Sequence, residues 1–216
     1  MCRWCKAKPH RIENTCVWHL LSFRYHYPYH FEMSIFHDRD RNAVLVIDVQ
    51  NEVVEEAFSR DQVIANINSL IERARKSSVP VIWVQHSDEG LKIDSQGWQI
   101  VPELIPLEGE KIIQKTFRSS FDDTALEETL RELGVNKLFI CGAQTNNCIR
   151  HTSHSALDRG YDIVLVSDAH TTSDYEWNGH AIKAKDVIDE QNDNLSNCNL
   201  PGRQGLAVEC SSISFL

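Results

Sequence analysis

Three side chains in this sequence have the chemistry of a nucleophilic catalytic centre: an acid, a base and a thiol. Asp48 closes the apolar run AVLVIDV, Lys115 closes the run KIIQK, and Cys148 follows KLFICG in the first turn of a predicted helix. Such runs are typical of buried strands, and ligands of open parallel sheets bind beyond the carboxyl ends of the strands. We therefore expect the three side chains to meet at one edge of a sheet.

The predicted chemistry is attack of a thiolate on a carbonyl carbon. A thiol near a helix N-terminus lies in a partial positive charge, which predicts a lowered pKa for Cys148. Lys115 would favour the thiolate further, and Asp48 could take the thiol proton and hand it to a leaving amine. Backbone amides around residues 144–148 could hold the oxyanion of the tetrahedral intermediate.

Each residue also has a simpler interpretation. A cysteine in an apolar α/β protein is often a small core residue, which is our interpretation of Cys141 inside its strand. Asp48 could cap a turn, and Lys115 could be a solvated residue at the sheet edge. The joint placement of Asp48, Lys115 and Cys148 favours the catalytic interpretation.

Alternating strands and helices must position these residues. Apolar runs predict strands at 43–49, 81–85, 111–115, 137–142 and 162–168, with a short sixth strand at 205–209. Helical periods follow at 61–74, where Asp61 is the expected cap, at 123–133, at 146–159 and at 180–189. This alternation predicts a doubly wound, Rossmann-like parallel sheet of five to six strands with helices on both faces.

Residues 1–41 lack any helix or strand period, and we expect a poorly ordered N-terminal extension before a catalytic domain at 42–216. The extension is basic up to Phe31, which faintly resembles an organellar presequence, and Met33 is an alternative natural start. Cys2, Cys5, Cys16 and His19 could be drawn as a zinc site, but no hydrophobic pattern supports a small fold around them.

Composition excludes several classes of function. The net charge of −9 and the pI near 5.5 lack the basic field that nucleic-acid binding needs. No apolar run approaches the roughly 18 to 20 residues that span a bilayer, and no secretory signal opens the chain. The seven cysteines form no framework spacing, so reduced thiols are expected. These features predict a cytoplasmic protein without membrane or nucleic-acid partners, with organellar import through the extension left open.

Four motifs resemble those of a known family. AVLVIDVQN at 43–51, KTFRSSF at 115–121, GAQTNNCIRHT at 142–152 and GYDIVLVSDAHTT at 160–172 are similar, in order and spacing, to motifs of the isochorismatase-like cysteine hydrolases. That family includes nicotinamidases, carbamoyl-group amidohydrolases and streptothricin hydrolase. The resemblance covers residues 42–215, and the stretches at 81–104 and 199–209 are most similar to the streptothricin hydrolase branch.

The resemblance implies roles for individual residues. Cys148 would be the nucleophile, Asp48 the general base and acid, and Lys115 the positive neighbour. A cis peptide would join Ala143 to Gln144, and the amides of Gln144 and Cys148 would form the oxyanion hole. Nicotinamidases carry an Asp-x-His and a further His as a metal site where this chain has the sequence QHSD at 85–88, so we expect neither a metal nor another cofactor.

The sequence thus predicts a hydrolase that cleaves a small-molecule amide or lactam C–N bond through a thioester. The resemblance also implies a homo-oligomer. Candidate substrate contacts near the predicted strand ends are Gln50, His86, Trp98 and Trp177. Two alternatives remain: a vestigial family member that acts as a binding or scaffold oligomer, and a vinyl ether hydrolase of the isochorismatase type, although isochorismatases generally lack the cysteine nucleophile.

Overall fold

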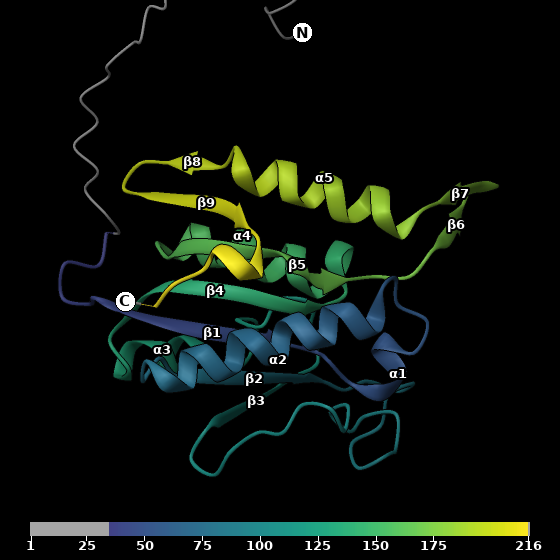
Figure 1. Cartoon of the computed structure of the whole chain (residues 1–216), viewed down its shortest axis with the longest axis horizontal. Coiled ribbons are helices and arrows are strands. Elements are labelled where there is room, and N and C mark those ends of the chain that lie inside the picture. Colours follow the sequence, from purple (N-terminus) through teal and green to yellow (C-terminus); the bar gives the residue numbers. More distant parts are fainter. Residues whose placement is uncertain (1–34, 216) are drawn as a thin grey trace, which may run out of the picture. The chain divides into compact units, whose positions relative to one another are not determined.

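The structure is a computed structural model that describes residues 35–215. Its central sheet has the strand order β3-β2-β1-β4-β5-β9-β8, and all neighbouring strands are parallel except β8 and β9 (Figure 1). The strands are β1 (Arg41–Ile47), β2 (Val81–His86), β3 (Lys111–Lys115), β4 (Val135–Ala143), β5 (Asp162–Thr171), β8 (Asn199–Leu200) and β9 (Arg203–Val208). The predicted parallel architecture is confirmed. The sheet has seven strands instead of five to six, because the two-residue β8 leaves no periodic signal in the sequence.

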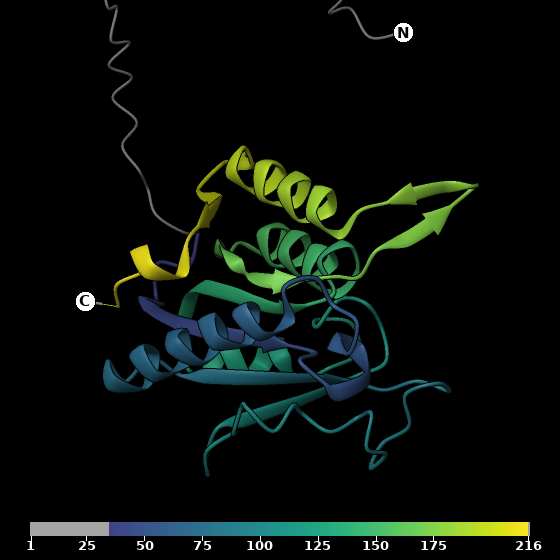
Figure 2. The same cartoon turned by 45° about the vertical axis from the view of Figure 1, so that its right-hand side comes forward.

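Helices cover both faces of this sheet, as Figures 1 and 2 show. The period of two in β1 explains why: Val44 and Val46 pack in the cluster that contains α2, whereas Leu45 and Ile47 pack in the cluster of the opposite face. The helical elements are α1 (Asn51–Val54), α2 (Arg60–Lys76), α3 (Leu126–Glu132), the π-helical turn η1 (Thr145–Ile149), α4 (Arg150–Arg159), α5 (Ala184–Ser196) and the 3₁₀ turn η2 (Cys210–Ser212).

Helix α2 has the apolar stripe that the sequence predicts. The six apolar residues with this helical spacing are all buried: Val63, Ile64, Ile67, Leu70, Ile71 and Ala74. The expected cap at Asp61 is wrong, because the N-cap position is Ser59 and Asp61 lies in the first turn, where its carboxylate accepts a 3.0 Å hydrogen bond from Arg60. The carboxylate therefore acts on the helix start through its charge alone.

The predicted helix at 180–189 is wrong at its beginning. Residues His180–Ile182 form β7, which pairs with β6 (Tyr175–Trp177) as a separate antiparallel hairpin, and α5 starts only at Ala184. The reason is a distant cap: the carboxylate of Asp174 accepts hydrogen bonds from the backbone amide of Ala184 (2.8 Å) and from the Lys183 ammonium (2.7 Å). A cap ten residues upstream has no local signature.

The ordered fold begins before Asn42. The ring of Phe36 lies 4.9 Å from that of Tyr161, and Arg39 donates a 3.0 Å hydrogen bond to the Tyr161 hydroxyl. Residues 36–41, which the sequence assigns to the N-terminal extension, thus include side chains that contact the domain, whereas the expectations for residues 1–34, with their cysteines and His19, lie outside the described residues. Between residues 35 and 215, no helix is both long and apolar enough to cross a bilayer.

Candidate active site

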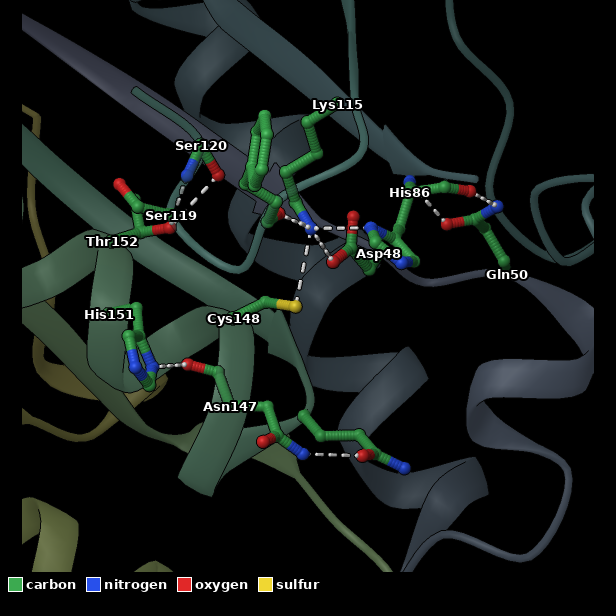
Figure 3. Close-up of polar contacts among 12 residues, drawn as sticks. Asp48, Gln50, His86, Lys115, Ser119, Ser120, Asn147, Cys148, His151 and Thr152 are labelled. Carbon is green, nitrogen blue, oxygen red and sulfur yellow. Dashed lines mark hydrogen bonds and ion pairs between the residues drawn. The ribbon is translucent and has the colours of Figure 1, made fainter. Parts of the chain in front are cut away.

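The acid, the base and the thiol predicted from the sequence meet at the carboxyl edge of the sheet (Figure 3). The Lys115 ammonium lies 2.7 Å from a carboxylate oxygen of Asp48 and donates a hydrogen bond to the sulfur of Cys148 at 3.2 Å. Asp48 follows β1, Lys115 ends β3, and Cys148 follows β4. Strands β3, β2, β1 and β4 are consecutive in the sheet, so three separate strand ends assemble the cluster.

Lys115 connects the members of the cluster. Its side chain is fully buried, and besides Asp48 and Cys148 its ammonium contacts Nδ1 of His86 (3.3 Å) and the carbonyl of Phe117 (3.2 Å). An ammonium has three protons and no acceptor, so its four contacts share three protons, and His86 Nδ1 can only accept from it. With Nδ1 as the acceptor, Nε2 carries the ring proton and donates to Asp88 at 3.1 Å.

Burial determines the protonation of the thiol. Desolvation raises the pKa of Cys148 to about 12, the charge of Asp48 raises it as well, and Lys115 only partly opposes them. Burial likewise raises the pKa of Asp48, against the lowering effect of Lys115. The lowered thiol pKa predicted from the helix N-terminus is therefore wrong, because desolvation outweighs the nearby positive charges. At rest, Cys148 is a thiol beside a carboxylate that is more basic than an ordinary aspartate.

Two backbone features mark the end of β4, shortly before Cys148. The peptide between Ala143 and Gln144 is cis, as the resemblance implied. Before it, Gly142 has φ of +119°, and a Cβ there would lie 2.0 Å from the carbonyl oxygen of Ile47. A glycine is therefore required where β4 passes the end of β1, one residue before Asp48.

A buried chain of hydrogen bonds fixes the start of η1. Thr145 contacts Nδ1 of His170 at 2.9 Å, and Nε2 of His170 contacts the side-chain oxygen of Asn192 at 2.9 Å. The Asn192 amide group donates to the carbonyl of Ser167, which leaves its oxygen to accept from Nε2. Burial lowers the pKa of His170 to about 4, so this ring is neutral and structural.

The segment after β3 is anchored to α4. Ser119 donates to the hydroxyl of Ser155 at 3.0 Å, and the backbone amide of Ser120 donates to Thr152 at 2.9 Å. With Lys115 bonded to the Phe117 carbonyl, residues 116–118 are held at both ends. The loop that carries Arg118 is therefore fixed beside the cluster.

A cleft of about 390 Å³ opens above the cluster. This volume suits a small organic molecule. Its wall is made of Asp48, Glu52, Val53, His86, Asp88, Gly90, Leu91, Arg118, Gln144, Asn147 and Cys148. Gln144 and Cys148, the residues expected to supply the oxyanion amides, thus border the same space as the Asp48 carboxylate. No group of three potential metal ligands occurs in residues 35–215.

Of the four expected substrate contacts, only His86 lines the cleft. Gln50 is fully buried and bonds the backbone of His86 in both directions, so its side chain positions His86. Trp98 is 8% exposed, and its carbonyl accepts from Gln50 at 2.8 Å. Trp177 is 67% exposed on the β6–β7 hairpin and is absent from the cleft wall.

Several residues of the cleft wall were not named as site residues from the sequence, among them the charged Arg118 and Glu52. Arg118 lies within the KTFRSSF motif, three positions after Lys115, and this spacing was the available signal. Glu52 lies in α1, directly after the first strand, where no pattern sets it apart from other exposed acids.

Comparisons with known proteins place these features in a family. Residues 42–193 match the isochorismatase domain. The chain is 34% identical over 142 residues to streptothricin hydrolase of Streptomyces noursei, a match that covers 63% of this chain and 56% of that protein. The chain therefore spans little more than half the length of this relative.

Two further matches cover more of the length of the similar protein. An uncharacterized isochorismatase family protein of Bacillus subtilis, YddQ, is 32% identical over 154 residues, covering 67% of this chain and 86% of that protein. The crystal structure of an isochorismatase from Pseudomonas putida superposes with a TM-score of 0.74 at 31% identity, covering 80% of this chain and 90% of that one. Because the family domain spans most of its length, this chain belongs to the isochorismatase family of hydrolases.

Proposed function

We propose that this protein hydrolyses a C–N bond of a small-molecule amide or lactam, with the Cys148 thiol as nucleophile and without a metal or other cofactor. The observation that carries the proposal is the buried contact of one ammonium, that of Lys115, with both the Asp48 carboxylate (2.7 Å) and the Cys148 sulfur (3.2 Å). A salt bridge buried only for stability would not need a thiol at the floor of an open cleft.

The first half of the reaction forms a thioester. Asp48 takes the thiol proton while the sulfur attacks the carbonyl carbon. The negative charge of Asp48 passes through the sulfur, the other neighbour of Lys115, to the carbonyl oxygen, so no net charge is added to the site. The amides of Gln144 and Cys148 stabilise the oxyanion. When the C–N bond breaks, Asp48 delivers its proton to the departing nitrogen.

The second half restores the enzyme. Water attacks the thioester carbonyl, Asp48 accepts a proton from the water, and the acid product leaves from the sulfur. The same proton returns to Cys148, which regains the thiol form that its raised pKa favours in the resting site. One water is consumed, and an acid and an amine are released.

A single substitution tests this scheme. A panel of primary amides and lactams is incubated with the purified protein, and amine release is measured. Cys148→Ala removes only the sulfur from a partly buried site, so the protein is expected to fold with an unchanged circular dichroism spectrum and to lose turnover. Undiminished turnover by Cys148→Ala refutes the assignment of Cys148 as the nucleophile. A wild-type protein that releases no amine from any member favours the vestigial alternative.

We further propose that the protein works as a homo-oligomer, as the family resemblance implies. Large apolar side chains are exposed near the hairpin, where Tyr175 is 42% and Trp177 is 67% exposed, and a subunit contact would bury them. Sedimentation velocity of the full chain at micromolar concentration tests this expectation, and a monomer would contradict it.

A further inference from the structure

One side chain of the cleft wall, Arg118, has hydrogen-bond donors that meet no acceptor within the described residues. Arg118 is exposed in the cleft wall, and among residues 35–215 no carboxylate, carbonyl or ring contacts its guanidinium. A guanidinium carries five N–H donors in a planar fork that matches a carboxylate. Its loop is anchored on one side by Lys115 and on the other by Ser119 and Ser120, so the side chain starts from a fixed base.

The other charges of the cleft are already engaged. Asp48 is paired with Lys115. One oxygen of Asp88 accepts from the amides of Gly90 and Leu91, both at 2.8 Å, and the other contacts His86. The charged side chains that are left to meet a ligand are Arg118 and Glu52.

Glu52 differs from Arg118 in one respect. Its carboxylate packs against the protein, since a Cβ added to Gly97 would lie 2.3 Å from a carboxylate oxygen of Glu52, and the backbone amide of Glu52 bonds the Gly97 carbonyl. The Arg118 guanidinium has no such support within the described residues. Arg118 is therefore the better candidate for a side chain whose hydrogen-bond donors are satisfied by a bound ligand.

We infer that the substrate carries a carboxylate that pairs with Arg118 while the amide carbonyl lies over Cys148. This inference rests on the proposed function and adds a substrate class to it: a half-amide of a dicarboxylic acid, or an acylated or carbamoylated amino acid. Arg118 would then determine specificity and would take no part in the chemistry of the thioester.

Binding to an inactive protein tests Arg118 separately from turnover. The probes are malonamate, succinamate and glutaramate, which place the carboxylate at three distances from the amide. Their comparators are the neutral amides with methyl in place of carboxylate, and the cationic β-alaninamide. Affinity is measured by calorimetry with Cys148→Ala, with and without Arg118→Gln. At least one half-amide should bind more tightly than its neutral comparator, and Arg118→Gln should weaken it by about 10- to 100-fold.

Matched variants identify the cause. Arg118→Lys keeps the charge and loses the fork, so an intermediate affinity is expected. Arg131→Gln removes an exposed arginine of α3 that pairs with Glu128, outside the cleft, and should change nothing. Glu52→Gln should leave or strengthen half-amide binding, because it removes a like charge from the cleft. Two results overturn the inference: no half-amide binds better than its neutral comparator, or β-alaninamide is preferred and depends on Glu52.

Ammonia release by the wild-type protein separates the two proposals. Half-amides that bind through Arg118 but are not hydrolysed leave the substrate inference standing and contradict the proposed function. Hydrolysis of neutral amides without preference for half-amides, unaffected by Arg118→Gln, supports the proposed function and contradicts the inference.

Discussion

At the residue scale, Asp48 has two opposite effects on Cys148. As a base it accepts the thiol proton, but as a neighbouring negative charge it raises the pKa of that thiol. The sequence was sufficient to find both residues, because strand ends of a parallel sheet share one edge. It could not give the sign of the thiol's pKa shift, since desolvation depends on how much of the chain packs around the sulfur.

This double effect gives a prediction for Asp48→Asn. Removal of the carboxylate leaves Lys115 beside the sulfur, so the pKa of Cys148 should fall and iodoacetamide should alkylate it about tenfold faster or more near pH 8. Amide turnover should fall at the same time by about 10² to 10⁴, since the proton acceptor is gone. Alkylation is followed by peptide mapping of Cys148.

Glu52→Gln is the matched control for that experiment, because it removes an exposed carboxylate from the same cleft without touching the ion pair. It should alter the alkylation rate far less. If Asp48→Asn instead slows alkylation, the account of the thiol's pKa is wrong.

Lys115 gives a prediction on stability. Lys115→Met leaves the carboxylate of Asp48 buried and unpaired, which should lower the free energy of unfolding by about 3 to 5 kcal/mol. Adding Asp48→Asn should recover part of that loss. Lys185→Met, which breaks the exposed pair with Asp189, should cost less than about 1 kcal/mol. Urea denaturation measures all four proteins, and equal losses for the two lysine variants would contradict the buried pair.

At the scale of elements, the close approach of Gly142 in β4 to Ile47 in β1 brings the turn that carries Cys148 next to Asp48. Periodicity predicted each strand of this region, because apolar runs report burial directly. It could not predict the hairpin of β6 and β7 or the start of α5, since the short strands are exposed and the cap, Asp174, is distant in sequence. The sequence also could not predict the hydrogen bonds that link Thr145, His170 and Asn192, because these residues lie on three separate elements, η1, β5 and α5.

Gly142→Ala should be far more harmful than Gly109→Ala. Both glycines have positive φ, +119° and +89°, so alanine is strained at either. At Gly142 the new Cβ would also lie 2.0 Å from the Ile47 carbonyl oxygen, whereas nothing lies within 4 Å at Gly109. We expect about 1 kcal/mol of destabilisation for Gly109→Ala and a loss of several kcal/mol or of folding for Gly142→Ala. Thermal melting and soluble yield measure this difference, and similar melting temperatures would contradict it.

His170 predicts a pH dependence of stability. The pKa of the buried ring is about 4, below the ordinary value of 6.5, so the unfolded chain binds more protons between these values. Stability should therefore rise with pH through that window, by about 3 kcal/mol from this group, and stay level above it. His170→Asn should flatten the change between pH 7 and pH 5, whereas His180→Asn, an exposed histidine of β7, should not. Denaturation at both pH values tests this, and an unchanged slope in His170→Asn would contradict it.

At the scale of the whole molecule, the residues that form the core and the residues that form the candidate active site lie in different parts of the fold. Helices on both faces bury the strands, and the cleft lies beyond the carboxyl ends of three strands, β1, β3 and β4. A sequence with this alternation could therefore predict the place of the site. The side chains that line the cleft could not be predicted in the same way, because Gln50 and Trp98 look like cleft residues in sequence but are buried, with Gln50 bonded to the Trp98 carbonyl.

The central claim is that the Cys148 sulfur becomes acylated. Wild-type protein is treated with p-nitrophenyl acetate as an activated acyl probe, quenched in acid and mapped by mass spectrometry of its peptides. The account predicts one acetyl group on the peptide that contains Cys148, its loss in Cys148→Ala, and its persistence when water cannot be activated in Asp48→Asn. Acetylation confined to other residues, or equal labelling of Cys148→Ala, would contradict the account.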